Sequence, residues 1–396
     1  MRNFDVIIIG AGAAGLMCAQ IAGKRGRSVL ILEHTEKPAE KIRISGGGRC
    51  NFTNYYSNPS NFISNNSHFC KSIFSKYSQK DFIELVQSHK IAFHEKKLGQ
   101  LFCNNTSQDI INMLLTECKK SDVTLQLKTN IHSVKALKIG FKVNTKVGNS
   151  HEILECKSLV IATGGLSIPK IGASKLGYEI AKQFGLGVTA LKPALVPLTF
   201  HSNFQSRCYA LSGVSVDAEI LIGKTSFREG LLFTHRGLSG PSVLQISSYW
   251  DQGAKITINL LPDLDLFSLI KQNKSEFPKK TLKTILYNHL PKRLVDDILS
   301  ELDLNGKLAD LSHEKLRSLS KRVQKWDVIP NGTEGYRTAE VTCGGVNVNE
   351  ISAQTMEAKS QKGLYFIGEV IDVTGHLGGY NFQWAWSSGF VAGQDV

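Results

Sequence analysis

The sequence FDVIIIGAGAAG occupies residues 4–15, and the run LMCAQIAGK follows it at residues 16–24. The β-branched run at residues 4–9 is typical of a parallel strand buried on both faces, and residues 16–24 are typical of a helix. Between them stands the pattern G-x-G-x-x-G, which binds dinucleotide phosphates when it joins a strand to a helix. This order of elements predicts a doubly wound α/β domain with a dinucleotide site.

The glycines of this pattern differ in function, since Gly10 permits the tight turn, Gly12 lets the backbone approach a pyrophosphate, and Gly15 lets the helix pack on the strand. Residues 28–32 predict a second strand ending in Glu33, whose carboxylate can bind both adenosine ribose hydroxyls. An acid there favours FAD or NAD over NADP, and the motif alone does not separate these two. The predicted residues of this part are Gly10, Ala11, Gly12, Ala13, Ala14, Gly15, Glu33 and His34.

Three further glycine-rich segments are predicted at the same edge of the sheet. Residues 41–54 read KIRISGGGRCNFTN, residues 158–165 read SLVIATGG, and residues 363–369 read GLYFIGE before the run GHLGGYNFQ at 375–383. Glycines after a strand expose backbone N–H groups to phosphate or to the polar edge of a ring. A flexible surface loop is the alternative for residues 41–54, and solvated loop acids are the alternative for Glu369 and Asp372.

These blocks, with EGLLFTHRGLSGP at 229–241 and AEVTCGGV at 339–346, resemble the bacterial FAD-dependent oxidoreductases that include dehydro-bile-acid reductase-like and aminoacetone-oxidase-like proteins. The resemblance extends from residue 6 to residue 393 and implies FAD as the bound cofactor. It implies that Lys41 and residues 45–51 lie under the flavin, that Ile131 contacts adenine, and that Asn381 and Phe382 meet the ring. With the strand-end residues, the predicted FAD contacts are Lys41, Ser45, Gly46, Gly47, Gly48, Arg49, Cys50, Asn51, Ile131, Ala162, Thr163, Gly164, Gly368, Glu369, Asn381 and Phe382.

The middle of the chain differs in character from both ends. Short runs rich in Val, Ile, Thr and Phe predict an antiparallel, barrel-like β domain, and residues 266–325 have helical periodicity. The expected fold class is α/β, with a discontinuous Rossmann-like FAD-binding domain at residues 1–190 and 342–396. The inserted β domain is expected at residues 191–265 and 326–341, and a small helical subdomain at residues 266–325.

The net charge is +13, from 47 Lys and Arg against 34 Asp and Glu. The helical segment 266–325 carries thirteen of the basic residues against seven acidic ones, but it lacks the interleaved aromatics that stack on bases. We therefore do not expect nucleic acid or a membrane as a partner, and the oligomeric state stays open. Eight dispersed cysteines without C-x-x-C or metal-ligand spacing predict a reduced, cytoplasmic protein with no metal.

If FAD is bound, the isoalloxazine performs the redox step, and His235 and His376 are the candidate proton donors or acceptors. Each histidine has the alternative of bonding a backbone carbonyl, and Cys50 and Cys343 have the alternative of packed, inert thiols. Because no second G-x-G-x-x-G is present, NAD(P)H as a donor would bind only transiently. Our main hypothesis is hydride transfer through flavin N5 to a small organic substrate, by a reductase or by an amine oxidase. The alternatives are an RNA-binding flavoprotein that modifies a nucleotide and a sensor that holds FAD without turnover.

Overall fold

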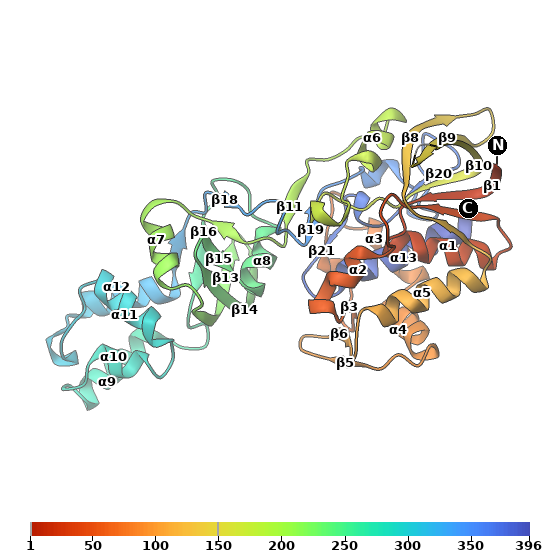
Figure 1. Cartoon of the computed structure of the whole chain (residues 1–396). Helices are drawn as coiled ribbons and strands as arrows, with labels where there is room; N and C mark the ends of the chain where they lie inside the picture. The colour runs from red at the N-terminus through yellow and green to blue at the C-terminus, as the bar shows by residue number, and fades with distance from the viewer. Residues whose placement is uncertain (1, 149) are drawn as a thin grey trace. The chain divides into compact units, whose positions relative to one another are not determined.

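Strand β1 (Arg2–Ile9) leads through the glycine-rich turn into helix α1 (Ala13–Lys24). The last four residues of the strand are buried, as expected for a continuous apolar run at the centre of a sheet. The computed structural model describes residues 2–148 and 150–396. It divides into two compact units, one of residues 1–192 with 341–396 and one of residues 193–340. The Rossmann-like fold of the first unit is therefore discontinuous in sequence (Figure 1).

The first unit is built on a seven-stranded sheet in which β1 pairs in parallel with both of its neighbours. The order is β7-β2-β1-β10-β9-β8, and β20 pairs in parallel with β10. β8 and β9 form an antiparallel extension at the β10 side. The remaining strands of this sheet are β2 (Val29–Leu32), β7 (Thr124–Gln126), β8 (Thr129–Ala136), β9 (Phe141–Val147), β10 (Ser150–Ile161) and β20 (Leu364–Phe366).

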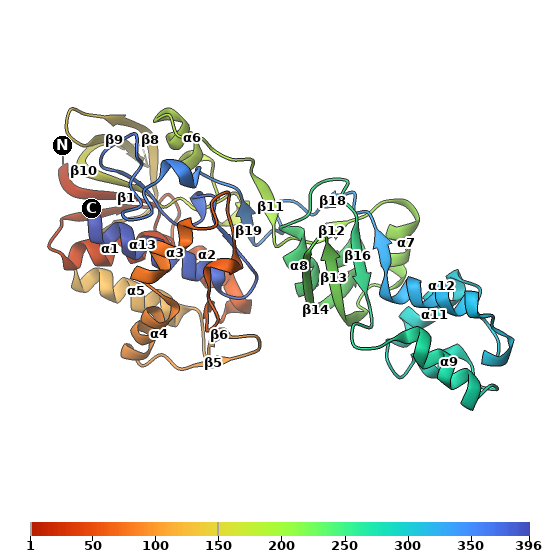
Figure 2. The same cartoon turned by 180° about the vertical axis from the view of Figure 1, so that it is seen from behind.

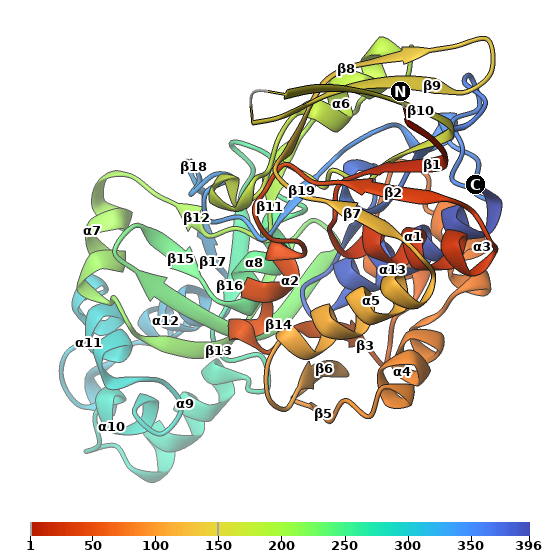
Figure 3. The ribbon, with the colours of Figure 1, turned by 45° about the vertical axis from the view of Figure 1, so that its right-hand side comes forward.

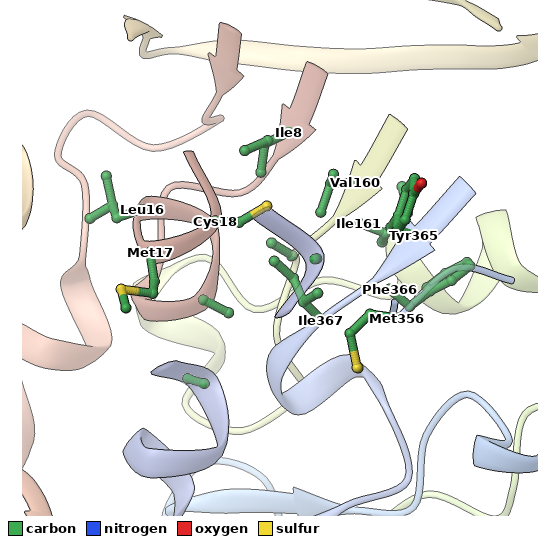
Figure 4. Packing of buried hydrophobic residues seen from close by; sticks show 14 of the residues in the cluster. Ile8, Leu16, Met17, Cys18, Val160, Ile161, Met356, Tyr365, Phe366 and Ile367 are labelled. Atoms are coloured by element: carbon green, nitrogen blue, oxygen red, sulfur yellow. The ribbon is translucent and has the colours of Figure 1, made fainter. Parts of the chain in front are cut away.

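Helices α1, α5 (Gln108–Lys120) and α13 (Tyr380–Asp395) lie on one face of this sheet (Figure 3). α13 packs closely on α1 because it presents glycine there: a Cβ on Gly389 would lie 2.5 Å from the Ala14 carbonyl oxygen, and one on Gly393 would lie 2.7 Å from that of Cys18. The core beneath them is made of side chains from β1, β10, β20 and α1 (Figure 4). The two ends of the chain thus form one core.

The segment between β2 and β7 and the segments after β10 and β19 complete this unit. They contain two small sheets, β3-β6-β5 and β4-β21, both antiparallel. Their elements are α2 (Glu40–Ile44), η1 (Ser45–Gly48), β3 (Asn51–Asn54), η2 (Pro59–Asn61), β4 (Phe62–Ile63), α3 (Phe69–Lys76), α4 (Gln79–Ser88), β5 (Phe93–Glu95), β6 (Gln100–Cys103), η3 (Pro169–Ile171), α6 (Leu176–Gln183), β19 (Val341–Cys343), η5 (Val348–Glu350), η6 (Gly368–Val370) and β21 (Thr374–Gly375). Strand β11 (Lys192–Ala194) begins at the last residue of this part and continues into the second unit.

The second unit has its own apolar core, to which both its strands and its helices contribute (Figure 2). Its antiparallel sheet has the order β17-β16-β13-β14-β15-β12-β18. The elements are β12 (Leu198–Thr199), α7 (Ser202–Ala210), β13 (Ser215–Ile222), β14 (Thr225–Thr234), β15 (Gly237–Ser239), α8 (Pro241–Ser247), β16 (Ile256–Asn259), α9 (Leu266–Glu276), α10 (Leu282–Leu286), α11 (Lys292–Glu301), η4 (Leu308–Asp310), α12 (His313–Gln324), β17 (Trp326–Val328) and β18 (Gly332–Thr333). Division of this insert into a β part and a helical part stays a prediction.

The strands of the structure differ from those expected from the sequence mainly in length. The strand expected at residues 158–162 is the end of the twelve-residue β10, whose first half pairs with the antiparallel β9. Because that first half has mixed polar and apolar residues, its strand signal is weaker than that of residues 158–161. No helix within residues 2–148 and 150–396 is long and apolar enough to cross a membrane.

Candidate functional site

The three glycines of the turn after β1 lie in different surroundings. Gly10 has φ +110°, and a Cβ there would lie 2.4 Å from the Ala162 carbonyl oxygen. A Cβ on Gly15 would lie 2.0 Å from the carbonyl oxygen of Gly10. At Gly12, by contrast, no described atom lies within 4 Å of the added Cβ. Gly10 and Gly15 therefore pack against protein, whereas Gly12 opens onto free space.

This free space lies at the N-terminus of α1. Gly12 is the N-cap residue, no side chain caps the helix, and its first turn has no acidic residue. The first backbone N–H groups of a helix have no partner within the helix and carry partial positive charge. An anion such as a pyrophosphate fits these properties.

Glu33 follows β2 and holds the glycine-rich turn with its buried carboxylate. Oε2 accepts a hydrogen bond from the Ala11 N–H at 2.9 Å. Oε1 accepts from the backbone N–H and the hydroxyl of Thr35, both at 2.9 Å, and lies 3.0 Å from His34 Nδ1. Burial raises the pKa of Glu33, but these donors outweigh it and lower the pKa to about 2. Glu33 is thus an anion at neutral pH, and the pKa of His34 is raised by the same contact.

The predicted contacts on β8 and after β10 lie at the same edge. The Thr129 N–H donates to the Glu33 carbonyl at 2.9 Å, so β8 begins beside Glu33, two residues before Ile131. The Ala162 N–H donates to the Ile9 carbonyl at 2.9 Å. After it, the Thr163 hydroxyl is buried and finds no hydrogen-bond partner within residues 2–148 and 150–396. A Cβ on Gly164, which has φ +70°, would also meet open space.

Lys41 of α2 and Glu369 of η6 form an ion pair between two segments that are far apart in sequence. Lys41 Nζ lies 2.5 Å from Glu369 Oε2 and donates to the Ser167 hydroxyl at 3.0 Å. The other carboxylate oxygen accepts from the Thr342 N–H at 2.9 Å and from the Ser167 hydroxyl at 3.1 Å. The pair is therefore fixed by four segments, and Glu369 is not a solvated loop acid.

The run Gly46–Gly48 adopts a backbone that favours glycine. The three φ values are +57°, +66° and +83°, and added Cβ atoms on Gly47 and Gly48 would meet no neighbour. The Ser45 hydroxyl donates to the Ile42 carbonyl at 2.8 Å, which fixes the entry to this turn. Arg49 is exposed, and burial raises the pKa of the Cys50 thiol, so this cysteine stays protonated. Consecutive N–H groups in such a left-handed turn suit an anion or a polar ring edge.

Polar side chains of β3 hold the turn that opens α13. With its amide oxygen toward Gly379, Asn51 accepts that residue's N–H at 3.2 Å. The Thr53 hydroxyl donates to Gln383 Oε1 at 2.6 Å, and Asn54 Nδ2 donates to the Gly378 carbonyl at 2.9 Å. Two sequence blocks separated by more than three hundred residues therefore form one rigid assembly.

Asn381 and Phe382 lie in the first turn of α13, and the structure shows what their side chains contact. The Asn381 amide oxygen accepts from the Gly375 N–H at 2.8 Å, and its nitrogen donates to the carbonyls of Gly375 at 2.8 Å and His376 at 3.3 Å. The Phe382 ring stacks on Trp386 at 5.7 Å between centroids. Asn381 thus closes the loop 375–381, and contact of either residue with a flavin stays a prediction.

The two candidate catalytic histidines differ in environment. His376 lies in the loop before α13. Its backbone N–H donates to the Asn61 carbonyl at 2.9 Å, and its ring packs edge to face against the Tyr380 ring. Burial lowers the pKa of His376 to about 4, so the ring is neutral at pH 7. It can exchange hydrogen bonds there but is not a cationic acid. His235 belongs to the second unit, exposed in the turn between β14 and β15.

Sequence reasoning missed several residues that shape this edge, namely Ser167, Thr342, Asn54 and Gln383. Thr342 also accepts the Leu166 N–H at 2.8 Å through its hydroxyl, so it holds the loop after β10. These positions lie inside or directly beside the glycine-rich blocks, which is the one signal that marks them. No group of three or more His, Cys, Asp and Glu in the described part of the chain is placed to hold a metal.

This arrangement fits a dinucleotide with a flavin. Added Cβ atoms on Gly12, Gly47, Gly48 and Gly164 would each meet open space, so these glycines leave room for a ligand, as a cofactor cradle requires. The buried Thr163 hydroxyl lies instead toward Gly177 of α6. The uncapped helix suits the pyrophosphate, and Glu33 suits a ribose.

Comparisons with known proteins agree with this fit. The family model described as "HI0933-like protein Rossmann domain" matches residues 4–395. The chain is 52% identical over 402 residues to the ribosomal RNA dihydrouridine synthase of Escherichia coli, covering 100% of this chain and 98% of the relative. It is 46% identical to the protein of that name from Haemophilus influenzae and 26% identical to the 3-dehydro-bile acid delta(4,6)-reductase of Clostridium scindens, each covering at least 97% of both chains.

Among solved structures, 3-ketosteroid delta1-dehydrogenase from Sterolibacterium denitrificans matches 99% of both chains with a TM-score of 0.54 at 13% identity, which shows a shared fold. The predicted Rossmann-like fold, FAD and oxidoreductase class are confirmed. The expectation that nucleic acid is not a partner is wrong, because the relatives at 52% and 46% identity are named for a ribosomal RNA substrate. It failed because it considered aromatic residues only in the helical insert.

Proposed function

The chain belongs to the HI0933-like Rossmann-domain family of flavin-dependent oxidoreductases, and on that premise we propose that it reduces a uridine of ribosomal RNA to dihydrouridine. The observation that carries this proposal is the 52% identity over 402 residues to a ribosomal RNA dihydrouridine synthase. The likeness extends over both units, so it includes the insert as well as the cofactor domain. Of the hypotheses drawn from the sequence, the comparisons support the nucleotide-modifying flavoprotein better than hydride transfer to a small organic substrate.

Saturation of the uracil C5–C6 bond adds one hydride and one proton. When bound, FAD would supply the hydride, and with NAD(P)H as donor the overall reaction would consume NAD(P)H and a proton and yield dihydrouridine and NAD(P)⁺. Because the chain has no second G-x-G-x-x-G, we propose that NAD(P)H binds transiently at the same site.

This chain's residues position the cofactor in four places. In our proposal the α1 N-terminus at Gly12 binds the pyrophosphate and Glu33 binds the adenosine ribose. The Lys41–Glu369 pair and the Gly46–Gly48 turn border the flavin end. Gly379 is the N-cap residue of α13, and no side chain caps this helix. In our proposal the positive N-terminal end of α13 faces the flavin and stabilises negative charge on the reduced ring.

The test is conversion of ribosomal RNA by the purified, FAD-loaded protein. RNA from a strain that lacks the gene is incubated with NADPH or NADH, digested to nucleosides and analysed by mass spectrometry. We expect dihydrouridine, heavier than uridine by two hydrogen atoms, to form only when RNA, reductant and protein are all present. Gly12→Ala is the matched control, since its added Cβ enters the open cradle and meets no protein atom.

The opposite result has a clear form. Rapid NAD(P)H oxidation with a small unsaturated ketone, or oxygen-dependent oxidation of an amine, without any dihydrouridine in RNA, would contradict the proposal. Such a result would favour a small organic molecule as the substrate of this protein.

A further inference from the structure

Positive charge in the first unit is concentrated in one part of the sequence. Residues 41–80 contain six Lys and Arg and no Asp or Glu. Lys41 and Arg43 pair with Glu369 and Glu40, and Lys76 donates to the Gln354 carbonyl. The other three are exposed and have no acidic partner in the described part of the chain; they are Arg49, Lys71 and Lys80.

Exposed rings lie in the same stretch of sequence, and the side chain of Gln79, the neighbour of Lys80, donates to the Tyr55 carbonyl at 3.0 Å. Tyr55 and Tyr56 follow β3 directly and are 42% and 67% exposed. Leu98, 57% exposed, lies opposite them at the tip of the β5–β6 hairpin, next to the exposed Lys96 and Lys97. The Tyr55 N–H donates to the Gly99 carbonyl at 2.9 Å, and a Cβ on Gly99 would lie 2.6 Å from the Tyr56 ring. The tyrosines and the hairpin tip therefore form one surface.

This surface is attached to the candidate flavin site through one side chain. Asn54 Nδ2 donates both to the Leu98 carbonyl at 3.0 Å and to the Gly378 carbonyl at 2.9 Å. One amide group thus links the hairpin tip to the turn that opens α13. An RNA strand whose target base lies at that turn would place its neighbouring nucleotides within reach of these rings.

A depression of about 500 Å³ is formed by the segment that follows Tyr56 in the sequence. It is lined by Asn58, Pro59, Ser60, Phe62, Ser67 and Lys71. Its apolar floor, Phe62, meets Tyr380 of α13 edge to face at 6.1 Å, and its neighbour Ile63 pairs with Thr374 of β21. The depression therefore also borders the loop that leads into α13.

We propose that Tyr55, Tyr56, Lys71, Lys80, Lys96 and Leu98, named here the tyrosine–lysine patch, bind the single-stranded RNA that flanks the target uridine. Exposed aromatic rings stack on bases of any sequence, and lysines neutralise the phosphates between them. This inference rests on the proposed function and adds to it the surface that holds the substrate.

The helical insert is less suited to RNA binding despite its charge. Lys283 pairs with Asp296 at 2.7 Å and Arg322 with Glu301 at 2.8 Å. The exposed ring of Phe277 is covered by the Lys280 ammonium group, 3.6 Å from its centroid. In the patch, by contrast, neither Lys71 nor Lys80 forms an ion pair with a carboxylate within residues 2–148 and 150–396.

The test measures binding of the FAD-loaded protein to a fluorescently labelled, uridine-rich, single-stranded RNA. We expect Tyr56→Ala to weaken binding about tenfold, and Tyr56→Phe, which keeps the ring, to retain most of the affinity. Tyr209→Ala is the matched control, because Tyr209 of α7 is 70% exposed and lies in the other unit. Lys71→Gln and Lys80→Gln should each flatten the slope of log affinity against log salt by about 0.7.

Three outcomes overturn the inference. The first is a wild-type protein that binds RNA and forms dihydrouridine while Tyr56→Ala binds equally well, which leaves the proposed function standing. The second is equal loss in Tyr56→Phe and Tyr56→Ala, or a loss confined to Tyr209→Ala. The third is a wild-type protein that neither binds RNA nor forms dihydrouridine, which removes the proposed function as well. Unchanged flavin absorbance and melting temperature in each variant confirm that it is folded and loaded.

Discussion

Gly12 and Gly15 stand three residues apart, and a methyl group at each has a different consequence. At Gly15 it would collide with the backbone carbonyl of Gly10 at 2.0 Å, where neither partner can move without shifting β1 or α1. At Gly12, where φ is −82°, it would meet nothing within the described part of the protein. Packing within the fold therefore requires glycine at position 15, whereas at position 12 only the proposed ligand would require it.

We therefore expect the free energy of unfolding of Gly12→Ala without FAD to lie within about 1 kcal/mol of the wild-type value. The same variant should bind FAD at least tenfold more weakly. Gly15→Ala should lose about 3 kcal/mol or more of folding free energy, because overpacking against backbone is not relieved by a rotamer change. Thermal melts of the FAD-free proteins and FAD titrations measure both effects. Equal FAD affinity in Gly12→Ala and wild type would show that the pyrophosphate lies elsewhere.

Glu33 gives the fold a defined response to acid. Its pKa is about 2 in the folded protein against a usual 4.5, so its stabilisation is complete above pH 4.5 and is lost as the pH falls toward 2. This difference between the two pKa values corresponds to roughly 3 kcal/mol of folding free energy for this buried group. Glu33→Gln should be less stable than wild type at pH 7, and the gap should close near pH 2.

Urea unfolding at a series of pH values measures that gap. Glu36→Gln is the matched control, because Glu36 lies three residues further on and is exposed. Parallel stability curves for Glu33→Gln and wild type between pH 2 and 5 would contradict the assignment.

At the scale of elements, the N-terminus of α13 is held by two sets of hydrogen bonds. Asn381 closes the loop before the helix, and Asn51, Thr53 and Asn54 of β3 hold the turn from the other side. Because these contacts join the two ends of the sequence, the helix end is fixed only in the folded unit. This rigidity suits a helix end that has to direct its N–H groups at one cofactor.

Asn54→Ala should loosen this assembly. It leaves the Leu98 and Gly378 carbonyls without this donor and should cost about 2 kcal/mol. Hydrogen exchange should quicken at residues 378–383, and FAD affinity should fall. Asn130→Ala, at an exposed asparagine of β8, is the control and should change neither quantity. Unchanged exchange in Asn54→Ala would show that Asn51 and Thr53 suffice.

At the scale of the whole molecule, two units with separate cores share one chain. One core is built from both ends of the sequence, and the other lies within residues 193–340. The charge is also divided unequally: the first unit has 28 Lys and Arg against 18 Asp and Glu, and the second has 19 against 16. Most of the +13 therefore belongs to the unit that binds the cofactor.

FAD should stabilise the two units unequally. At an FAD concentration about 100 times its Kd, we expect about 2.7 kcal/mol of added protection for amides in the core of the first unit. Amides around Phe233 and Trp326, in the core of the second unit, should exchange at nearly the same rate with and without FAD. Hydrogen exchange followed by mass spectrometry resolves the two. Equal protection in both units would show that they fold as one cooperative body.

Much of the fold of the cofactor domain was predictable because short sequence patterns encode it. The buried run before Gly10, the glycine spacing and Glu33 are encoded within thirty residues, and each has a physical reason independent of the rest of the chain. The roles of Ser167, Thr342 and Asn54 were not predictable, because each acts on a partner brought close only by folding. The RNA substrate that we propose was not expected for a related reason, since the exposure of a ring such as Tyr56 follows from the fold and cannot be seen in the sequence.

The sequence by itself determined the strand, turn and helix that bind a dinucleotide, and the family to which the chain belongs, since both depend on residue types at short spacing. Only the tertiary structure decided which glycines face protein and which face open space, that Asn381 closes its own loop, and that Tyr55 and Tyr56 stay exposed. Those properties depend on distances between segments distant in sequence, and chain folding alone sets such distances.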